Sequence, residues 1–183
     1  MQNLTVVMTV NILGCGIDPG VKGAIGWVAP DGIWRVETMP ATNTEIWRII
    51  STLVDTMKRG DLAVVIALEK QWHRGTSSDR LNGKNLSTFL QHYGALKAIL
   101  ELCGVEPLQS PTDRLLAGKA YLVEVEPRTW QSELLGATGK GETKDAAQEY
   151  VARNLSKGKV LKSQADALCL ALYARQWGRM RLS

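Results

Sequence analysis

Two apolar segments that each end on an acidic residue constrain the fold of this chain more than any other feature. The first, 11–17, is followed by Asp18 and then by the turn-forming pair Pro19-Gly20. The second, 62–68, is an unbroken apolar run that ends on Glu69. Apolar runs of this length, bounded by turn residues, are typical of strands that are buried on both faces. The sequence therefore predicts two core strands, each with a carboxylate at its carboxyl end.

The rest of the chain alternates between strand-like and helix-like patterns. Further strands are predicted within 21–28, 33–38 and 121–125, and helices over about 43–58, 85–103, 143–155 and 163–177, with a short one that opens at Pro127. This order predicts an α/β fold in which helices cover both faces of a mixed sheet. We expect a single domain over 1–183, because no repeat and no long linker divides the chain.

Composition narrows the class of protein. The chain has 183 residues, 45% of them hydrophobic, and a formal net charge of +4. Its three cysteines, Cys15, Cys103 and Cys169, are far apart and lie in apolar contexts, which favours reduced core thiols over disulfides or a zinc site. No apolar run reaches the length of a membrane span and no secretion signal is recognisable, so we expect neither membrane insertion nor secretion.

Basic residues gather in two loops that are rich in glycine and small polar residues. Those around the first loop are Lys70, His73, Arg74, Arg80 and Lys84, and those around the second are Lys140 and Lys144. Positive charge alone would fit any soluble basic protein, but clustering in loops favours a polyanionic partner such as nucleic acid. The first loop also contains Trp72, which on its residue type alone could pack into the core.

A third acid, Asp166, interrupts the apolar pattern near the start of the last predicted helix. Taken singly, each acid has an ordinary structural explanation. Asp18 could cap its turn, and Asp166 could interact with the helix dipole. Glu69 could pair with Lys70 or Arg74.

Taken together, the three acids point to metal-dependent chemistry. If the two core strands are adjacent and parallel, their carboxyl ends bring Asp18 and Glu69 to one edge of the sheet. Carboxylates gathered there, Asp166 included, would repel one another unless cations neutralised them. Two hard divalent ions held by such oxygen ligands can promote the hydrolysis of a phosphodiester.

Three motifs, spread in order over nearly the whole chain, resemble the RuvC-type Holliday-junction resolvases of the ribonuclease H-like superfamily, particularly their phage-borne members. They are Gly16-Ile17-Asp18-Pro19-Gly20, Ala67-Leu68-Glu69-Lys70-Gln71 and Gln164-Ala165-Asp166-Ala167-Leu168, together with Gly139-x-Gly141-x-x-Lys144. The resemblance implies a ribonuclease H-like mixed five-stranded sheet flanked by helices on both faces. It also implies a homodimeric crossover junction endodeoxyribonuclease that nicks paired strands of four-way DNA junctions, in the cytoplasm of a bacterial cell or a phage-infected host.

The resemblance also assigns roles to individual residues. Asp18, Glu69 and Asp166 would bind Mg²⁺ or Mn²⁺, with two ions in each active site. Lys144 would meet the scissile phosphate, and Trp72 would stack on bases at the junction. The other residues of the two basic loops, Lys70, His73, Arg74, Arg80, Lys84 and Lys140, would contact DNA. The stretch 91–94 resembles the glycine-containing part of the helix that forms the family's dimer contact.

The chain departs from the family pattern in two places. Ser163 stands one helical turn before the last acid, where the family usually carries an Asp or His as a fourth ligand. A serine hydroxyl is a poor ligand beside a carboxylate. We therefore expect either that Ser163 is the ligand and the second ion is weakly held, or that another group, such as Gln164 or a water, fills the gap. The segment 108–119 looks like an insertion.

Two other classes of protein stay open. One is a related ribonuclease H-like nuclease that acts on flaps or RNA–DNA hybrids, and the other is a junction-binding protein with little turnover because Ser163 replaces a carboxylate. A nucleotide-binding protein of the actin-like sheet family is less favoured, because the paired glycine-rich phosphate loops of that family are not evident.

Overall fold

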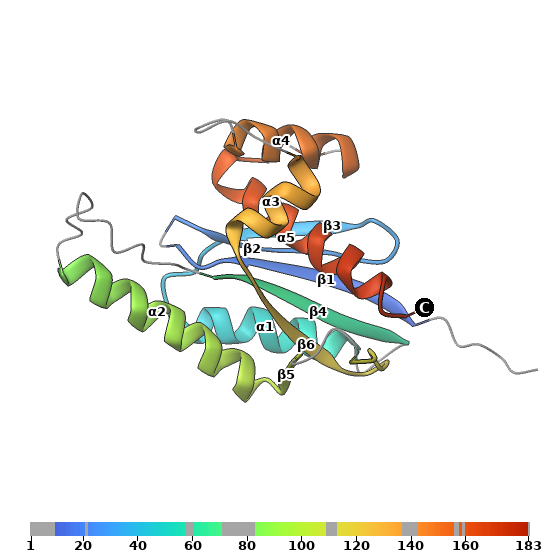
Figure 1. Ribbon diagram of the computed structural model, residues 1–183. Helices are drawn as coiled ribbons and strands as arrows, with labels where there is room; N and C mark the ends of the chain where they lie inside the picture. Colours follow the sequence, from blue (N-terminus) through green and yellow to red (C-terminus); the bar gives the residue numbers. More distant parts are fainter. Residues whose placement is uncertain are drawn as a thin grey trace, which may run out of the picture.

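A mixed sheet of six strands forms the centre of the computed structural model (Figure 1). The structure describes residues 10–20, 22–57, 61–70, 83–108, 113–136, 143–155, 158 and 160–182; for residues 57 and 83–89 it describes the backbone but not the side chains. In spatial order the strands are β3 (Trp34–Thr38), β2 (Ala24–Val28), β1 (Asn11–Asp18), β4 (Leu62–Glu69), β6 (Ala120–Val125) and β5 (Val105–Pro107). Strands β1, β4, β6 and β5 run parallel, whereas β2 is antiparallel to both of its neighbours. The predicted mixed sheet is confirmed, but it has one strand more than the five expected.

The additional strand is β5, a three-residue edge strand that pairs in parallel with β6. Val105 is buried and anchors it to the core, while Pro107 has no N–H with which to continue a ladder. A run of three residues is too short to show a period of two, which is why the sequence did not predict it.

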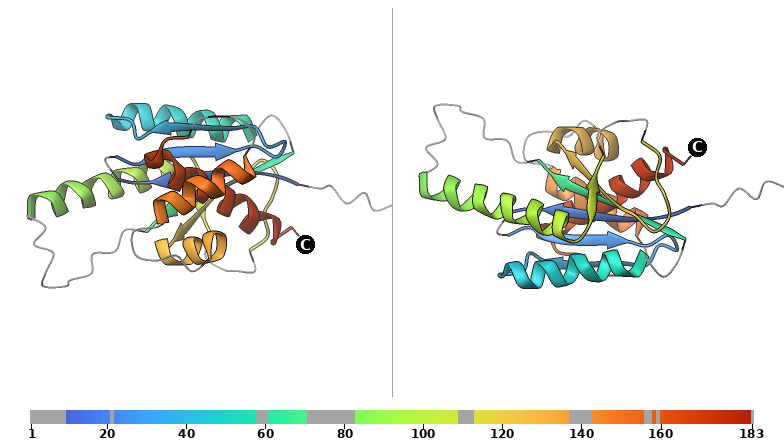
Figure 2. Two further views of the ribbon diagram at one scale, coloured as in Figure 1. Left: turned by 90° about the horizontal axis from the view of Figure 1, so that it is seen from above. Right: turned by 90° about the horizontal axis from the view of Figure 1, so that it is seen from below.

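Helices cover both faces of the sheet, as predicted. On one face lie α1 (Asn43–Met57) and α2 (Gly83–Leu102), and on the other α3 (Pro127–Leu135), α4 (Thr143–Asn154) and α5 (Lys162–Arg179), as the two views of Figure 2 show. No helix in the described part of the chain combines the length and the apolar character needed to cross a membrane.

The two faces of the sheet carry separate apolar cores, and the strands alternate between them. The core beneath α1 and α2 receives Leu13, Cys15 and Ile17 from β1 and Val64, Ile66 and Leu68 from β4. The core beneath α3, α4 and α5 receives Ile12, Ala63, Val65 and Ala67. Since successive side chains of a strand point to opposite faces, Asp18 and Glu69 are both directed to the face that carries α5.

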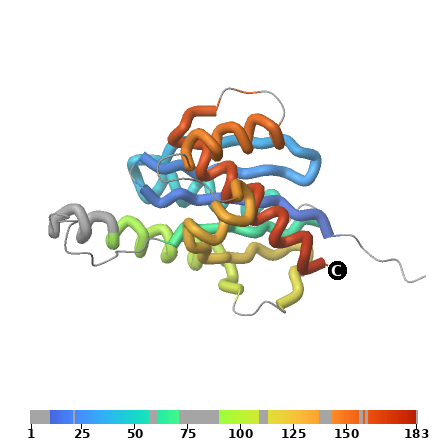
Figure 3. The backbone as a smooth tube through the Cα atoms, turned by 45° about the horizontal axis from the view of Figure 1, so that its top comes forward, coloured from blue at the N-terminus to red at the C-terminus, as the bar shows by residue number. Residues whose placement is uncertain are grey.

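Helix α5 crosses β1 at unusually short range (Figure 3). A Cβ atom built on Gly16 would lie 2.1 Å from the carbonyl oxygen of Ala167, and one on Gly14 would lie 2.1 Å from that of Ala171. Only glycine leaves room for the helix backbone at these two positions. The contact therefore fixes the start of α5 against the end of β1.

The segment 108–119, interpreted from the sequence as an insertion, is tied to the sheet at its described ends. The backbone N–H of Leu108 donates to Leu122, and that of Gly118 donates to Leu62. Leu115 is buried in the core beneath α5. Residues 109–112 lie outside the description, and both the insertion and the single-domain organisation stay predictions.

Candidate active site

Asp18 and Glu69 lie at the same edge of the sheet because β1 and β4 are adjacent and parallel. The register pairs Ile17 with Leu68, and each acid is the next residue of its strand. The predicted juxtaposition of the two strand ends is therefore confirmed. The chain turns away at once after Asp18, whose Oδ1 accepts a hydrogen bond of 3.2 Å from the backbone N–H of Gly20. Both carboxylates are partly buried.

Asp166 reaches the same edge from α5. It immediately precedes Ala167, whose carbonyl oxygen packs against Gly16, two residues before Asp18. The Oδ1 atom of Asp166 is buried, and no hydrogen-bond partner for it exists among the described residues. A buried carboxylate oxygen without a partner is costly, and a bound cation is one way to satisfy it.

The charges of the three acids act on one another in every pairing. Burial raises the pKa of Glu69 to about 7, and although the hydrogen bond from Trp130 opposes this shift, the charges of Asp18 and Asp166 add to it. Burial, with the charge of Asp18, raises the pKa of Asp166 to about 6. Burial also raises the pKa of Asp18, against the hydrogen bond from Gly20 and the charge of Lys144. The edge is thus a place where negative charge is unfavourable without a cation.

The donor set at this edge suits a hard divalent ion. Asp18, Glu69 and Asp166 offer oxygen ligands only, which Mg²⁺ and Mn²⁺ prefer. In the described ranges, however, no three His, Cys, Asp or Glu side chains are arranged to hold a metal ion as they stand. Binding would therefore require Asp18 or Asp166 to rotate toward Glu69, and the buried, unpartnered Oδ1 of Asp166 is an atom that such a rearrangement would satisfy.

Lys144 lies in the first turn of α4 and is exposed. Its positive charge lowers the pKa values of Asp18 and Asp166, against the larger effect of burial. Lys144 is thus close enough to Asp18 and Asp166 for its charge to act on them. A contact between Lys144 and a phosphate at that edge, which the resemblance implies, requires such a position.

Ser163 and Gln164 begin the turn of α5 that leads to Asp166. Ser163 is partly buried and lies one helical turn before Asp166, as expected from the sequence. The Oε1 atom of Gln164 accepts a hydrogen bond of 3.3 Å from the backbone N–H of Leu161. Because this oxygen already caps the helix, Gln164 is a weaker candidate for the missing ligand than the sequence suggested.

The sequence did not predict that Trp130 of α3 takes part in this site. Its Nε1 atom donates a hydrogen bond of 2.9 Å to Oε1 of Glu69. The sequence predicted the short helix that begins at Pro127 but no role for the tryptophan in it. The available signal was a tryptophan on a short helix that directly follows a core strand, since a buried indole N–H needs an acceptor.

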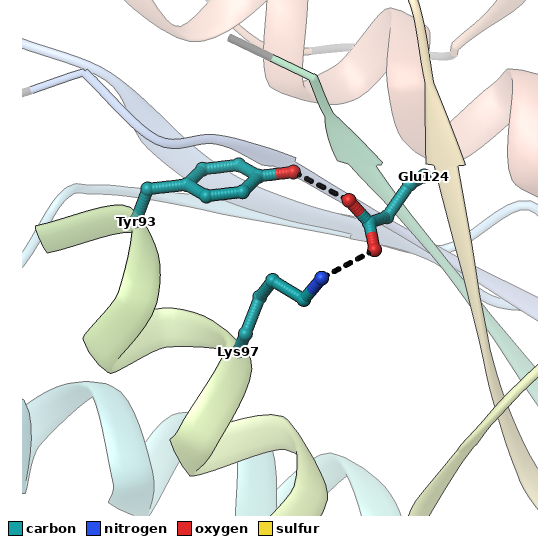
Figure 4. Close-up of polar contacts among 3 residues, drawn as sticks. All are labelled: Tyr93, Lys97 and Glu124. Carbon is teal, nitrogen blue, oxygen red and sulfur yellow. Dashed lines mark hydrogen bonds and ion pairs between the residues drawn. The ribbon is translucent and has the colours of Figure 1, made fainter. Parts of the chain in front are cut away.

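A second polar cluster occupies the opposite face of the same edge (Figure 4). Glu124 of β6 accepts hydrogen bonds from the Tyr93 hydroxyl at 2.8 Å and from Lys97 Nζ at 2.7 Å. Although burial acts in the other direction, these bonds and the charges of Lys97 and Lys70 hold the pKa of Glu124 below its ordinary value. Lys70, expected to contact DNA, is therefore close enough to Glu124 to interact with it.

The other residues expected at a DNA interface have no described side chains. Trp72, His73, Arg74, Arg80 and Lys140 lie outside the described residues, and Lys84 falls in the first turn of α2 without a described side chain. Their roles stay predictions.

The similarity to known proteins is one of structure. No protein-family model matches the sequence, and no curated protein matches it significantly. The RuvC protein of Thermus thermophilus in complex with a Holliday junction substrate superposes with a TM-score of 0.56 at 17% identity, covering 92% of this chain and 96% of that one. A further Thermus thermophilus RuvC structure gives a TM-score of 0.50 at 18% identity, with the same coverage. The yeast mitochondrial Holliday junction resolvase Ydc2 reaches 0.43 at 15% identity over 93% of this chain and 79% of that one, a score too low to support an argument.

At these identities the comparison concerns the fold. The order of the strands, the helices on both faces and the match to RuvC over nearly the whole chain define a ribonuclease H-like fold. The resemblance to RuvC-type resolvases is thus confirmed at the level of the fold.

Proposed function

We propose that this protein is a divalent-metal-dependent endonuclease that resolves four-way DNA junctions. The observation that carries the proposal is the mutual electrostatic interaction of Asp18, Glu69 and Asp166 at one edge of a RuvC-like sheet. One of the two RuvC structures with the same fold is bound to a Holliday junction substrate, which favours branched DNA as the partner.

The three acids would hold the metal ions, and each has a scaffold that suits this task. Asp18 and Glu69 come from adjacent core strands, and Asp166 comes from the helix that packs most tightly on β1. Mg²⁺ or Mn²⁺ bound there, ideally as two ions, would supply Lewis acidity for the attacking water and for the departing 3′ oxygen. Lys144 would bind a non-bridging oxygen of the scissile phosphate and compensate its charge in the transition state.

Helix α2 is the surface that we propose for dimerisation. Leu90 and Leu102 are 54% and 80% exposed on it, although both are large apolar side chains. Among the described residues, no atom lies within 4 Å of a Cβ built on Gly94, so a second copy of the chain can approach the helix closely there. A two-fold dimer would supply two active sites for the two strands that a resolvase must cut.

Cleavage of a synthetic mobile four-way junction in the presence of Mg²⁺ or Mn²⁺, with products sized on a denaturing gel, tests the proposal. We expect paired nicks from the wild type and none from Asp18→Asn, which should still bind the junction. Flap and RNA–DNA hybrid substrates in parallel reactions would identify a related nuclease of different specificity. An Asp18→Asn protein that cuts at the wild-type rate would show that the mechanism is wrong.

A junction-binding protein with little turnover is the second candidate. Two observations favour it: Ser163 stands where the family has a carboxylate or histidine, and no three ligand side chains in the described part of the chain form a complete metal site. Tight junction binding without cleavage in either metal would support this alternative.

A further inference from the structure

Trp130 lies directly beside the candidate active site and is entirely enclosed. Of the fully buried side chains in the described ranges it is the largest, at 0% exposure, within the core beneath α3, α4 and α5. Its only polar atom donates to Oε1 of Glu69 at 2.9 Å. A buried indole N–H requires an acceptor, and most side-chain hydrogen bonds in proteins go to the backbone or to water. Here the acceptor is one of the three acids.

The backbone between the sheet and Trp130 is short and stiff. The register places Val125 opposite Glu69, and the N–H of Lys70 donates to Val125 at 2.7 Å, so that the ladder holds both strands to their last residues. Two residues later Pro127 begins α3 with the fixed φ that suits the first helical position. Trp130 therefore takes its position relative to Glu69 from the local backbone.

We propose that Trp130 is the positioning residue for Glu69, and that its N–H holds Oε1 so that the carboxylate meets an incoming divalent ion in a fixed orientation. The inference rests on the proposed function, because it assigns Glu69 to the metal-binding edge. A free glutamate side chain has three rotatable bonds, and restraining them before the ion arrives removes part of the entropy lost on binding. Residues that orient a metal ligand in this way typically contribute 10- to 100-fold to metal affinity or activity.

A purely structural role for the same bond makes different predictions. In that case the carboxylate would only satisfy the indole N–H, and loss of the N–H would change stability without changing metal affinity. Two replacements of Trp130 separate the alternatives. Trp130→Phe keeps an aromatic ring but has no N–H, and β-(3-benzothienyl)alanine keeps nearly the whole shape with sulfur in place of the N–H.

The test is Mn²⁺ binding to the full chain without DNA, measured by isothermal titration calorimetry. We expect binding about 10- to 100-fold weaker in both replacements. The matched control is Leu134→Ala, which removes buried volume one turn further along the same face of α3 but not the bond to Glu69. It should lose stability and keep the wild-type affinity for Mn²⁺.

A spectroscopic measurement completes the test, because it shows whether the carboxylate that accepts the Trp130 hydrogen bond is the one that takes up the metal. The indole N–H resonance of Trp130 in a ¹H–¹⁵N spectrum, identified by its absence from Trp130→Phe, should shift as Mg²⁺ is added. Wild-type affinity in the benzothienyl variant, or an indole resonance that saturating Mg²⁺ leaves unchanged, would overturn the inference.

The outcomes also separate this inference from the proposed function. A wild type that binds Mn²⁺ through a Trp130-dependent site but cuts no DNA would refute the nuclease and leave the positioning role intact. A wild type that cuts junctions with no change on replacing Trp130 would do the reverse. Absence of Mn²⁺ binding to the wild type would overturn both.

Discussion

Replacing Glu69 by Gln should stabilise the metal-free protein at alkaline pH and leave its stability unchanged in acid. Glutamine preserves the shape of the side chain and a carbonyl oxygen for the Trp130 N–H, but it carries no charge. The ionised carboxylate is unfavourable at this position, because burial and the charges of Asp18 and Asp166 outweigh the hydrogen bond from Trp130. The substitution therefore removes an electrostatic penalty that exists only when Glu69 is ionised.

The direction of the pH dependence follows from the raised pKa of Glu69. In the unfolded chain Glu69 loses its proton at its ordinary pKa of 4.5, whereas in the folded protein its pKa is about 7. Between these values the folded state binds more protons than the unfolded state, so the free energy of unfolding falls as the pH rises. The stabilising contribution is complete below pH 4.5 and is lost once the pH has passed 7.

The size of the effect follows from the same two values. At about 1.36 kcal/mol per pKa unit, they correspond to a penalty of about 3 kcal/mol above pH 7. This is an upper limit, because part of the penalty is repulsion from Asp18 and Asp166, which falls when those carboxyl groups are themselves protonated. Glu69→Gln should accordingly gain up to about 3 kcal/mol over the wild type at pH 8 and nothing at pH 4.5.

Urea unfolding in EDTA from pH 4.5 to 8.5, followed by tryptophan fluorescence, measures this difference. The control is Glu101→Gln, which removes the same charge from an exposed position on α2. Mg²⁺ at pH 8 should stabilise the wild type more than Glu69→Gln, since the ion binds the folded state. If the difference between Glu69→Gln and wild type were the same at pH 5 and pH 8, the electrostatic reasoning would be refuted.

Three further substitutions test the packing, the ligand set and the dimer. Gly16→Ala places a Cβ 2.1 Å from the carbonyl oxygen of Ala167, so α5 must move away from β1. We expect the free energy of urea unfolding to fall by several kcal/mol, as overpacking and backbone shifts cause, and Mn²⁺ binding to weaken. Unchanged stability and binding would contradict the close contact. Ser163→Asp adds a carboxylate one turn before Asp166 and should lower the Mg²⁺ concentration needed for half-maximal cleavage by about 10-fold or more. If that concentration were unchanged, the side chain at 163 would not face the ions. Gly94→Ala should stabilise α2 by about 0.5–1 kcal/mol, because its Cβ meets no atom of the described residues, and it should weaken self-association in sedimentation equilibrium. Association that is unaffected would exclude a close helix contact at Gly94.

Features encoded in short stretches of sequence were predictable. The apolar runs of β1 and β4, the acid at the end of each and the apolar spacing of the main helices follow from the local period of side chains along one element. The sequence prediction depended on β1 and β4 being adjacent and parallel, which the sequence did not show. The register of Ile17 with Leu68 shows it. The short strand β5 had too few residues to carry a period.

The sequence by itself singled out the three acids of the candidate site, because an acid that ends a buried strand or interrupts an apolar helix is visible within a few positions. Only the tertiary structure decided how those acids are held. The bond from Trp130 joins residues 61 positions apart, and that from Tyr93 to Glu124 joins residues 31 positions apart. Gly16 likewise meets Ala167 only because α5 returns across β1. Such contacts depend on the order of strands in the sheet and on which helix covers which face. The period of side chains along one element predicts neither of these.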